Sequence, residues 1–207
     1  TKVKLGFPFL NRAKAEIGFA YGRLNDYYFQ TSNMTFPNAT TDHSWYDLFA
    51  GSLSIERNSL DYKQYPISGR KQFLVAQYVT GTEKYMPSPI TDMGSFDRKV
   101  HSWLQMKGEW EQYKTISPHF NLGFMSELVL SSKNLMNNYT ASVLQAPAFT
   151  PTPHSQIVFN EAFRANQYVA FGLSPILKFS KLLHFRLDMY GFAPLYEIKK
   201  EEVWRSE

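Results

Sequence analysis

The chain has 207 residues and a formal net charge of +4; 19% of its residues are charged and 16% are aromatic. Few aromatic residues and a high net charge are typical of disorder, so this composition excludes it. No run of about 18 apolar residues occurs, which excludes transmembrane helices. Without cysteine, disulfides, thiol catalysis and cysteine metal ligands are excluded as well.

Both ends of the chain indicate a piece of a longer polypeptide. No signal peptide precedes the first predicted strand, and the sequence stops abruptly at Glu207. We therefore expect residues 1–207 to form a single domain with neighbours elsewhere in the parent chain.

Apolar and polar residues alternate with a period of two, which is typical of strands with one apolar face. Between residues 101 and 112, one face holds Leu104, Met106, Gly108 and Trp110, and the other holds Gln105, Lys107, Glu109 and Glu111. Such patterns predict an antiparallel all-β fold. The predicted strands cover residues 2–9, 13–22, 44–57, 69–81, 99–116, 119–132, 165–177 and 182–196.

The connections between these strands alternate in length. Segments 11–12, 117–118 and 178–181 are short, segment 58–68 is intermediate, and segments 23–43, 82–98 and 133–164 are long and polar. Short turns at one end and long loops at the other are typical of an outer-membrane β-barrel. An interfacial girdle would contain the aromatic residues near strand ends, which are Tyr27, Tyr28, Trp45, Tyr46, Tyr78, Tyr85, Trp103, Tyr113 and Tyr196.

A soluble β-sandwich also alternates apolar and polar residues and is the main alternative. The polar faces here mix carboxylates and cations, however, as in His184, Arg186 and Asp188 on one strand. Such mixtures suit a polar lumen of paired charges. Several predicted strands also reach ten residues or more, which a tilted membrane-crossing strand requires.

Motifs for catalysis or cofactor binding are missing from the sequence. There is no GxSxG, P-loop or GxGxxG pattern, and the five histidines are widely spaced, so neither a cofactor nor a metal is expected. Glu109 and Glu111 share a face as a glycosidase pair would. We interpret them instead as partners of inward cations such as Lys107 and Arg186. Nucleic acid is not an expected partner, because aromatic and charged residues fall on opposite faces.

Two segments resemble a known superfamily. The first runs from Phe49 to Gly69 and includes Asp61 and Pro66; the second starts at Phe159 and includes Arg164-Ala165-Asn166. Together they resemble the barrel of outer-membrane assembly factors and two-partner-secretion transporters, and most of all the C-terminal barrel of Bacteroidetes patatin-like phospholipases. The glycine of the general superfamily's loop tip is Ala165 here.

The resemblance implies a transmembrane β-barrel in the outer membrane of a Gram-negative bacterium. A complete barrel of this superfamily has sixteen strands, so about eight or more would be visible here. The patatin domain is absent, and this chain is expected to anchor or translocate rather than to catalyse. Implied partners are outer-membrane lipid, the barrel-assembly machinery during insertion, and a second copy in a homo-oligomer. The alternatives are a polypeptide-transporting or membrane-protein-assembly barrel, and a soluble β-barrel that binds a hydrophobic ligand.

The resemblance also implies an ion pair inside the lumen. The long loop from Lys133 to Ala165 is expected to include an ordered segment, because it is rich in proline and aromatic residues. Arg164 at its end is expected to pair with an inward carboxylate, first Asp188, then Glu127 or Glu109. The alternative is an exposed Arg164 that pairs with nearby Glu161.

Overall fold

The computed structural model describes residues 1–28, 41–86, 97–133, 136, 139–180, 183–196 and 198. Its strands form one antiparallel sheet in the order β1-β2-β3-β4-β5-β6-β7-β8, and β9 also pairs with β7. The prediction of an all-β antiparallel fold is therefore confirmed. The strands are β1 (Lys2–Leu10), β2 (Ala13–Tyr28), β3 (Asp42–Asn58), β4 (Gly69–Met86), β5 (Asp97–Ser117), β6 (Phe120–Ser131), β7 (Gln167–Lys178), β8 (His184–Arg186) and β9 (Met189–Tyr196).

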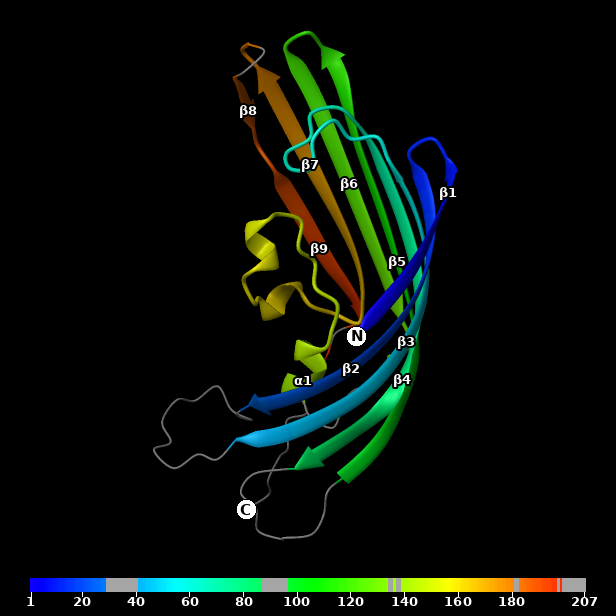
Figure 1. The fold of residues 1–207 in the computed structure, drawn as a ribbon. Helices are drawn as coiled ribbons and strands as arrows, with labels where there is room; N and C mark the ends of the chain where they lie inside the picture. Colours follow the sequence, from blue (N-terminus) through cyan, green and yellow to red (C-terminus); the bar gives the residue numbers. More distant parts are fainter. Residues whose placement is uncertain are drawn as a thin grey trace, which may run out of the picture.

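The sheet is strongly curved and open. Figure 1 shows it bending around a segment that lies on its concave side, with the short turns toward the top of the view. Among the described strands, no pairing joins β1 to β8 or β9, so hydrogen bonds do not close the sheet into a barrel. No helix in the described part of the chain is long and apolar enough to span a bilayer.

Four strands extend further at the long-loop end than the sequence pattern predicted. β2 continues to Tyr28, β3 begins at Asp42, β4 continues to Met86, and β5 begins at Asp97. These extensions carry polar and charged residues on both faces, so they lack the alternation on which the prediction relied. They belong to the end of the sheet from which the long connections start. Residues 29–40 and 87–96, which were predicted as parts of the long loops, lie outside the described residues.

The last predicted strand, 182–196, is broken into β8 and β9. The break at Leu187 and Asp188 lies opposite Pro175 in β7. Leu187 N–H donates to Pro175 O at 3.1 Å. Proline has no N–H to donate in return, so the ladder loses a bond at this point. The side chain of Asp188 instead accepts hydrogen bonds from Ser174 and Arg186.

The two faces of the sheet differ in the way the alternation predicted. Large apolar side chains on the convex face are exposed, while Lys71 of β4 and Lys107, Glu109 and Glu111 of β5 point into the hollow. The exposed apolar residues of the convex face include Val3, Leu5, Phe7, Ile17, Phe19, Phe49, Leu53, Ile55, Leu74, Tyr78, Leu104, Met106, Phe124, Leu128, Phe171 and Leu173.

Four aromatic residues of the expected girdle lie on the other face. Tyr46, Trp103 and Tyr113 are buried on the concave side and Tyr85 packs against the same cluster as Tyr46, so their assignment to an outward girdle is wrong. The ring of Tyr113 lies over Gly123 of β6, where an added Cβ would come within 2.3 Å of the ring. A glycine at this position is required because the ring occupies the space of its side chain.

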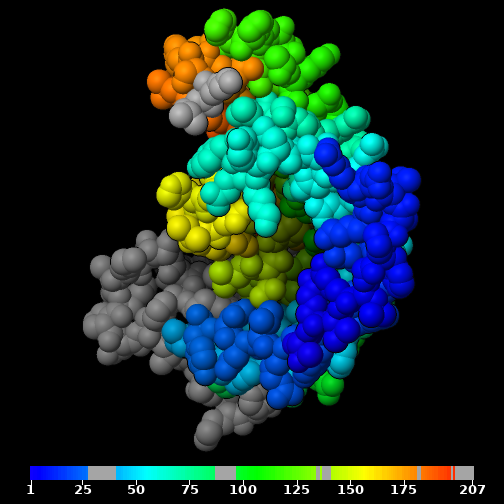
Figure 2. All heavy atoms as spheres, turned by 45° about the horizontal axis from the view of Figure 1, so that its top comes forward, coloured from blue at the N-terminus to red at the C-terminus, as the bar shows by residue number. Residues whose placement is uncertain are grey.

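The hollow is occupied by residues 139–166, hereafter the inserted segment. It contains α1 (Tyr139–Leu144) and the short 3-10 helices η1 (His154–Gln156) and η2 (Glu161–Phe163). Figure 2 shows this segment, in yellow, seated between the two arms of the sheet. The prediction that the loop from Lys133 to Ala165 includes an ordered part is confirmed.

Two apolar clusters fix the inserted segment to the sheet. Ala141 of α1 and the preceding Met136 pack with Tyr46, Val79 and Trp103 of β3, β4 and β5. The second cluster unites Phe149 and Ala165 with side chains of β6, β7 and β9, which are Val129, Tyr168, Ala170, Met125 and Phe192. Burial of aromatic rings on both sides of the contact makes this segment an integral part of the fold.

Candidate functional site

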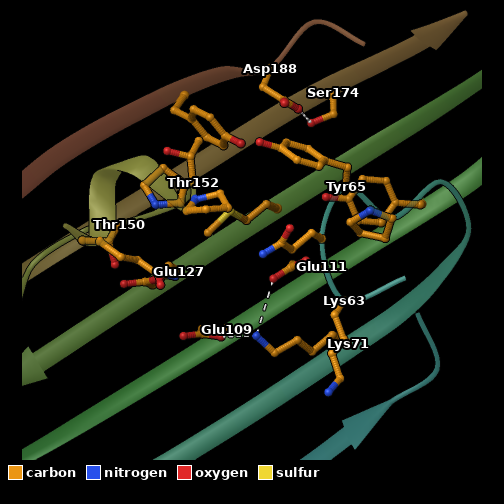
Figure 3. Close-up of a pocket in the computed structure, with 18 of the residues that line it drawn as sticks. Lys63, Tyr65, Lys71, Glu109, Glu111, Glu127, Thr150, Thr152, Ser174 and Asp188 are labelled. Carbon is orange, nitrogen blue, oxygen red and sulfur yellow. Dashed lines mark hydrogen bonds and ion pairs between the residues drawn. The ribbon is translucent and has the colours of Figure 1, made fainter. Parts of the chain in front are cut away.

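The main cavity lies between the concave face and the inserted segment, with a volume of about 590 Å³. Its walls are formed by inward side chains of β4 to β9, by residues 63–66 of the β3–β4 turn, and by residues 150–153 of the inserted segment. In Figure 3, Tyr65 and Thr152 approach the cavity from opposite sides, above the carboxylates of β5. The lining is predominantly polar and charged.

A chain of ion pairs crosses the floor of this cavity. Lys71 Nζ lies 2.8 Å from Glu109 Oε2 and 3.6 Å from Glu111 Oε1. Lys107 Nζ lies 2.9 Å from Glu109 Oε1 and 3.0 Å from Glu127 Oε1. The expected pairing of Glu109 with Lys107 is therefore confirmed. Because lysines neutralise these carboxylates, the wall is a set of cross-strand charge pairs that stabilise the neighbouring strands.

Glu127 connects this chain of ion pairs to the inserted segment. It is buried, and it accepts a hydrogen bond from the hydroxyl of Tyr168 on β7. Tyr168 in turn packs edge-on against Phe149. The polar floor and the apolar cluster under the inserted segment thus share one side chain, so a change at Tyr168 would disturb both.

Arg186 is the centre of a second group of contacts at the short-turn end. Its Nε donates to Asp188 Oδ1 at 2.7 Å, and its Nη1 donates to Pro66 O at 2.8 Å. Its Nη2 donates to the Tyr113 hydroxyl at 3.1 Å, and its guanidinium lies over the rings of Tyr65 and Tyr113. The predicted partnership of Arg186 with Glu109 and Glu111 is not formed, because Asp188 on its own edge of the sheet is closer.

The β3–β4 turn is shaped by its own sequence. Asp61 accepts hydrogen bonds from the N–H groups of Tyr62 and Ile67 at 3.0 and 3.1 Å, and from the Ser68 hydroxyl at 3.2 Å. The turn ends at Gly69, whose φ of +102° favours glycine. This geometry directs the carbonyl of Pro66 inward, toward Arg186.

Arg164 does not form the predicted ion pair. Its Nη1 donates to the carbonyls of Leu144 and Ala146 at 3.1 and 3.0 Å, just past the end of α1. Among the described residues no carboxylate lies within ion-pair distance of its guanidinium, which stacks on the ring of Phe159. A cation satisfies the free carbonyls at a helix C-terminus, which explains this position.

The three carboxylates expected to bind Arg164 have nearer partners. Asp188 pairs with Arg186, Glu127 with Lys107, and Glu109 with both Lys71 and Lys107. All three point into the same cavity, as expected. The sequence predicted the face of these carboxylates correctly. It contained no signal that the end of α1 would present carbonyls to Arg164. Burial lowers the pKa of Arg164.

A buried polar group lies at the long-loop end of the hollow. Glu83 is fully buried, accepts a hydrogen bond from the Tyr46 hydroxyl at 3.1 Å and lies 2.7 Å from His101 Nε2. Nearby, Lys133 Nζ donates to Gln145 O at 2.7 Å and lies over the ring of Trp103. Burial lowers the pKa of Lys133 to about 8, while the Glu83 carboxylate acts in the opposite direction. Sequence reasoning missed this group, because its members come from five separate segments.

Metal-binding geometry was not found in the described residues, where no three His, Asp or Glu side chains gather around one point. Comparisons with known proteins were equally uninformative. No described protein family, no curated protein and no solved structure matches the chain.

Proposed function

We propose that the chain is part of a transmembrane β-barrel of the bacterial outer membrane, and that it anchors or translocates rather than catalyses. The carrying observation is the distribution of side chains on the sheet. Exposed apolar residues cover the convex face from β1 to β9, while ion pairs line the concave face. A water-soluble protein has the opposite arrangement, with apolar residues inside and charges outside. In a bilayer, the outward apolar face contacts lipid and the inward charges line a polar lumen.

The height of the apolar face supports the same proposal. On β3, the outward residues Asp47 and Arg57 are ten residues apart, and only apolar residues and glycine face outward between them. On β5, the corresponding limits are Ser102 and Gln112. Ten residues span about 33 Å along a strand. At a tilt of about 40°, that is close to the apolar band of about 25 Å in outer-membrane barrels.

An open sheet cannot remain open in a hydrocarbon environment, because its edge N–H and C=O groups would lack partners. Further strands must therefore complete the barrel. The resemblance to patatin-like phospholipases suggests a sixteen-stranded barrel, with these strands as about half of it. In such a parent protein, acyl-ester hydrolysis would be carried out by a serine in a domain outside this chain.

The alternative of a polypeptide-conducting barrel is favoured by the charged hollow, and opposed by the inserted segment packed inside it. The alternative of a soluble barrel with a hydrophobic ligand is opposed by the polar lining of the cavity. Planar-bilayer recordings distinguish an anchor from a polypeptide-conducting barrel. An anchor filled by its own loop should show little conductance, whereas a conducting barrel should show measurable conductance.

The membrane assignment is tested by electrophoresis and extraction. We expect the protein to require detergent for solubility and to migrate differently in unheated and heated samples, because closed barrels resist dodecyl sulfate until heated. A protein that remains soluble in detergent-free buffer, with one mobility under both conditions, would overturn the proposal.

A further inference from the structure

Three cations occupy the outward edge of the apolar face at the short-turn end. They are Arg57 on β3, Arg70 on β4 and Lys114 on β5. The strand register places Arg57 opposite Gln72, and Arg70 opposite Gln112. Each cation is therefore two residues along a neighbouring strand from the next, a diagonal separation of about 7–8 Å. The three cations and two glutamines form a stepped row of hydrogen-bond donors.

These cations have no acidic partner in the described part of the chain. Arg57, Arg70 and Lys114 are exposed and take part in none of its ion pairs. No described strand residue that faces outward at this end is a carboxylate. Their positive charge is therefore available to an external anion.

An apolar groove lies directly beside this row. Its volume is about 340 Å³, which is within the range of about 300–1,000 Å³ for small-molecule sites. Ala13, Ile55, Leu74 and Trp110 line it, and Arg57 stands at its edge. Ala13 has the smallest side chain in the lining and leaves space between its larger neighbours.

The opposite end of the same face provides an internal comparison. A second groove of about 420 Å³ lies there, lined by residues such as Val3, Phe19 and Phe49. The cation beside it, Arg23, donates to Asp47 at 2.8 Å and is neutralised. Both grooves are apolar, but the nearest arginines differ: Arg57 takes part in no ion pair of the described residues, whereas Arg23 is paired with Asp47.

We propose that the short-turn groove binds an anionic phospholipid of the surrounding membrane. The phosphodiester accepts hydrogen bonds from Arg57 and Arg70, with Lys114 as the third cation, and one acyl chain lies between Ala13 and Trp110. Guanidinium groups bind phosphate oxygens in a bidentate manner. This inference rests on the proposed function, because an acyl chain reaches the convex face only if that face contacts lipid.

Native mass spectrometry in detergent micelles tests the site without requiring insertion into a bilayer. With phosphatidylglycerol and phosphatidylcholine added in equal amounts, we expect the protein to retain phosphatidylglycerol preferentially. The double variant Arg57→Gln/Arg70→Gln should lower its apparent affinity about tenfold or more, since each cation near a lipid surface contributes about 1 kcal/mol. The matched control Arg23→Gln should leave it unchanged.

Trp110 provides a second readout that places the acyl chain. Phosphatidylglycerol brominated on its acyl chains should quench the tryptophan emission of the unmodified protein, and Trp110→Phe should remove most of that quenching. Equal retention of both lipids, or equal loss in Arg23→Gln and the double variant, would overturn the proposal.

Inorganic phosphate and glycerophosphoglycerol, which have no acyl chains, distinguish a lipid site from a phosphate site. We expect neither to displace the lipid at millimolar concentration; displacement by either would reduce the site to simple anion binding and overturn the groove assignment. Failure here is distinguishable from failure of the membrane assignment, which would instead appear as detergent-free solubility.

Discussion

The two faces of β5 differ in polarity: the convex face is apolar and the concave face is charged. Met106 is 41% exposed on the convex face, whereas Lys107 and Glu109 beside it are paired in the hollow. In a soluble protein the apolar residues would be inside and the charges would face water. Here Lys107, Glu109 and Glu111 all have ion-pair partners, while Leu104 and Met106 on the outward face are exposed. Under the proposed function, the partner of the convex face is the hydrocarbon of the bilayer.

The largest expected effect is on the convex face. Met106→Arg should lower the free energy of unfolding in lipid by about 2–4 kcal/mol, because the residue lies near the middle of the apolar band. Gln105→Arg, one residue earlier on the concave face, is the matched control and should cost much less. Urea unfolding in detergent or lipid measures both. Equal costs for the two variants would contradict the assignment of the faces.

The next effect concerns the concave face. Arg186→Gln leaves Asp188 without its cation and Pro66 O without its donor, and should cost about 2–3 kcal/mol. It should also speed proteolysis in the β3–β4 turn, which Arg186 holds. The more exposed pair of Lys14 and Glu16 serves as a control, since Lys14→Gln should cost no more than about 1 kcal/mol.

Asp188→Asn in the Arg186→Gln background separates the ion pair from the rest of the contacts. If the uncompensated carboxylate causes most of the loss, the double variant should recover part of the stability. A double variant as unstable as the sum of the single variants would attribute the loss to the contacts with the turn instead.

A smaller effect is expected in the inserted segment. Arg164→Met removes the donor to the carbonyls of Leu144 and Ala146, and should lower local stability by about 1–2 kcal/mol without unfolding the sheet. Faster hydrogen exchange in residues 139–146, with unchanged protection in β6 and β7, is the expected signature. Gln156→Ala, an exposed position in the same segment, should leave exchange unaltered. Loss of protection throughout β6 and β7 would instead indicate a role in the sheet.

The sequence predicted the sheet well where one face is apolar. Alternation around Leu104 and Glu109 identified both the strand and the direction of its side chains. It failed at the strand extensions near Tyr28 and Met86, where both faces are polar, and at Pro175, whose effect appears on the neighbouring strand. Period-two patterns report the environment of each face, so they contain no information where the two environments are alike.

The candidate site was predicted only in part, for a related reason. Glu109, Glu127 and Asp188 were correctly assigned to the inward face by alternation. Their partners depend on which side chains lie close across strands or in the inserted segment, and that is determined by register and by the path of residues 139–166. Arg164 was therefore assigned the wrong partner, although the inward direction of the three carboxylates was predicted correctly.

The smallest expected effect is a dependence on pH at Lys133, which lies beyond the end of β6. Its pKa is about 8 in the folded protein, against 10.5 for an exposed lysine, because burial disfavours the charged form. Between these two pH values the unfolded chain binds more protons than the folded one, so stability rises with pH in this window. From pH 8 to pH 9 the gain should be about 1 kcal/mol. Lys133→Met has no proton to release and should remove this rise, while Lys63→Met, at an exposed turn position, should retain it. A rise of the same size in Lys133→Met would assign the dependence to another group.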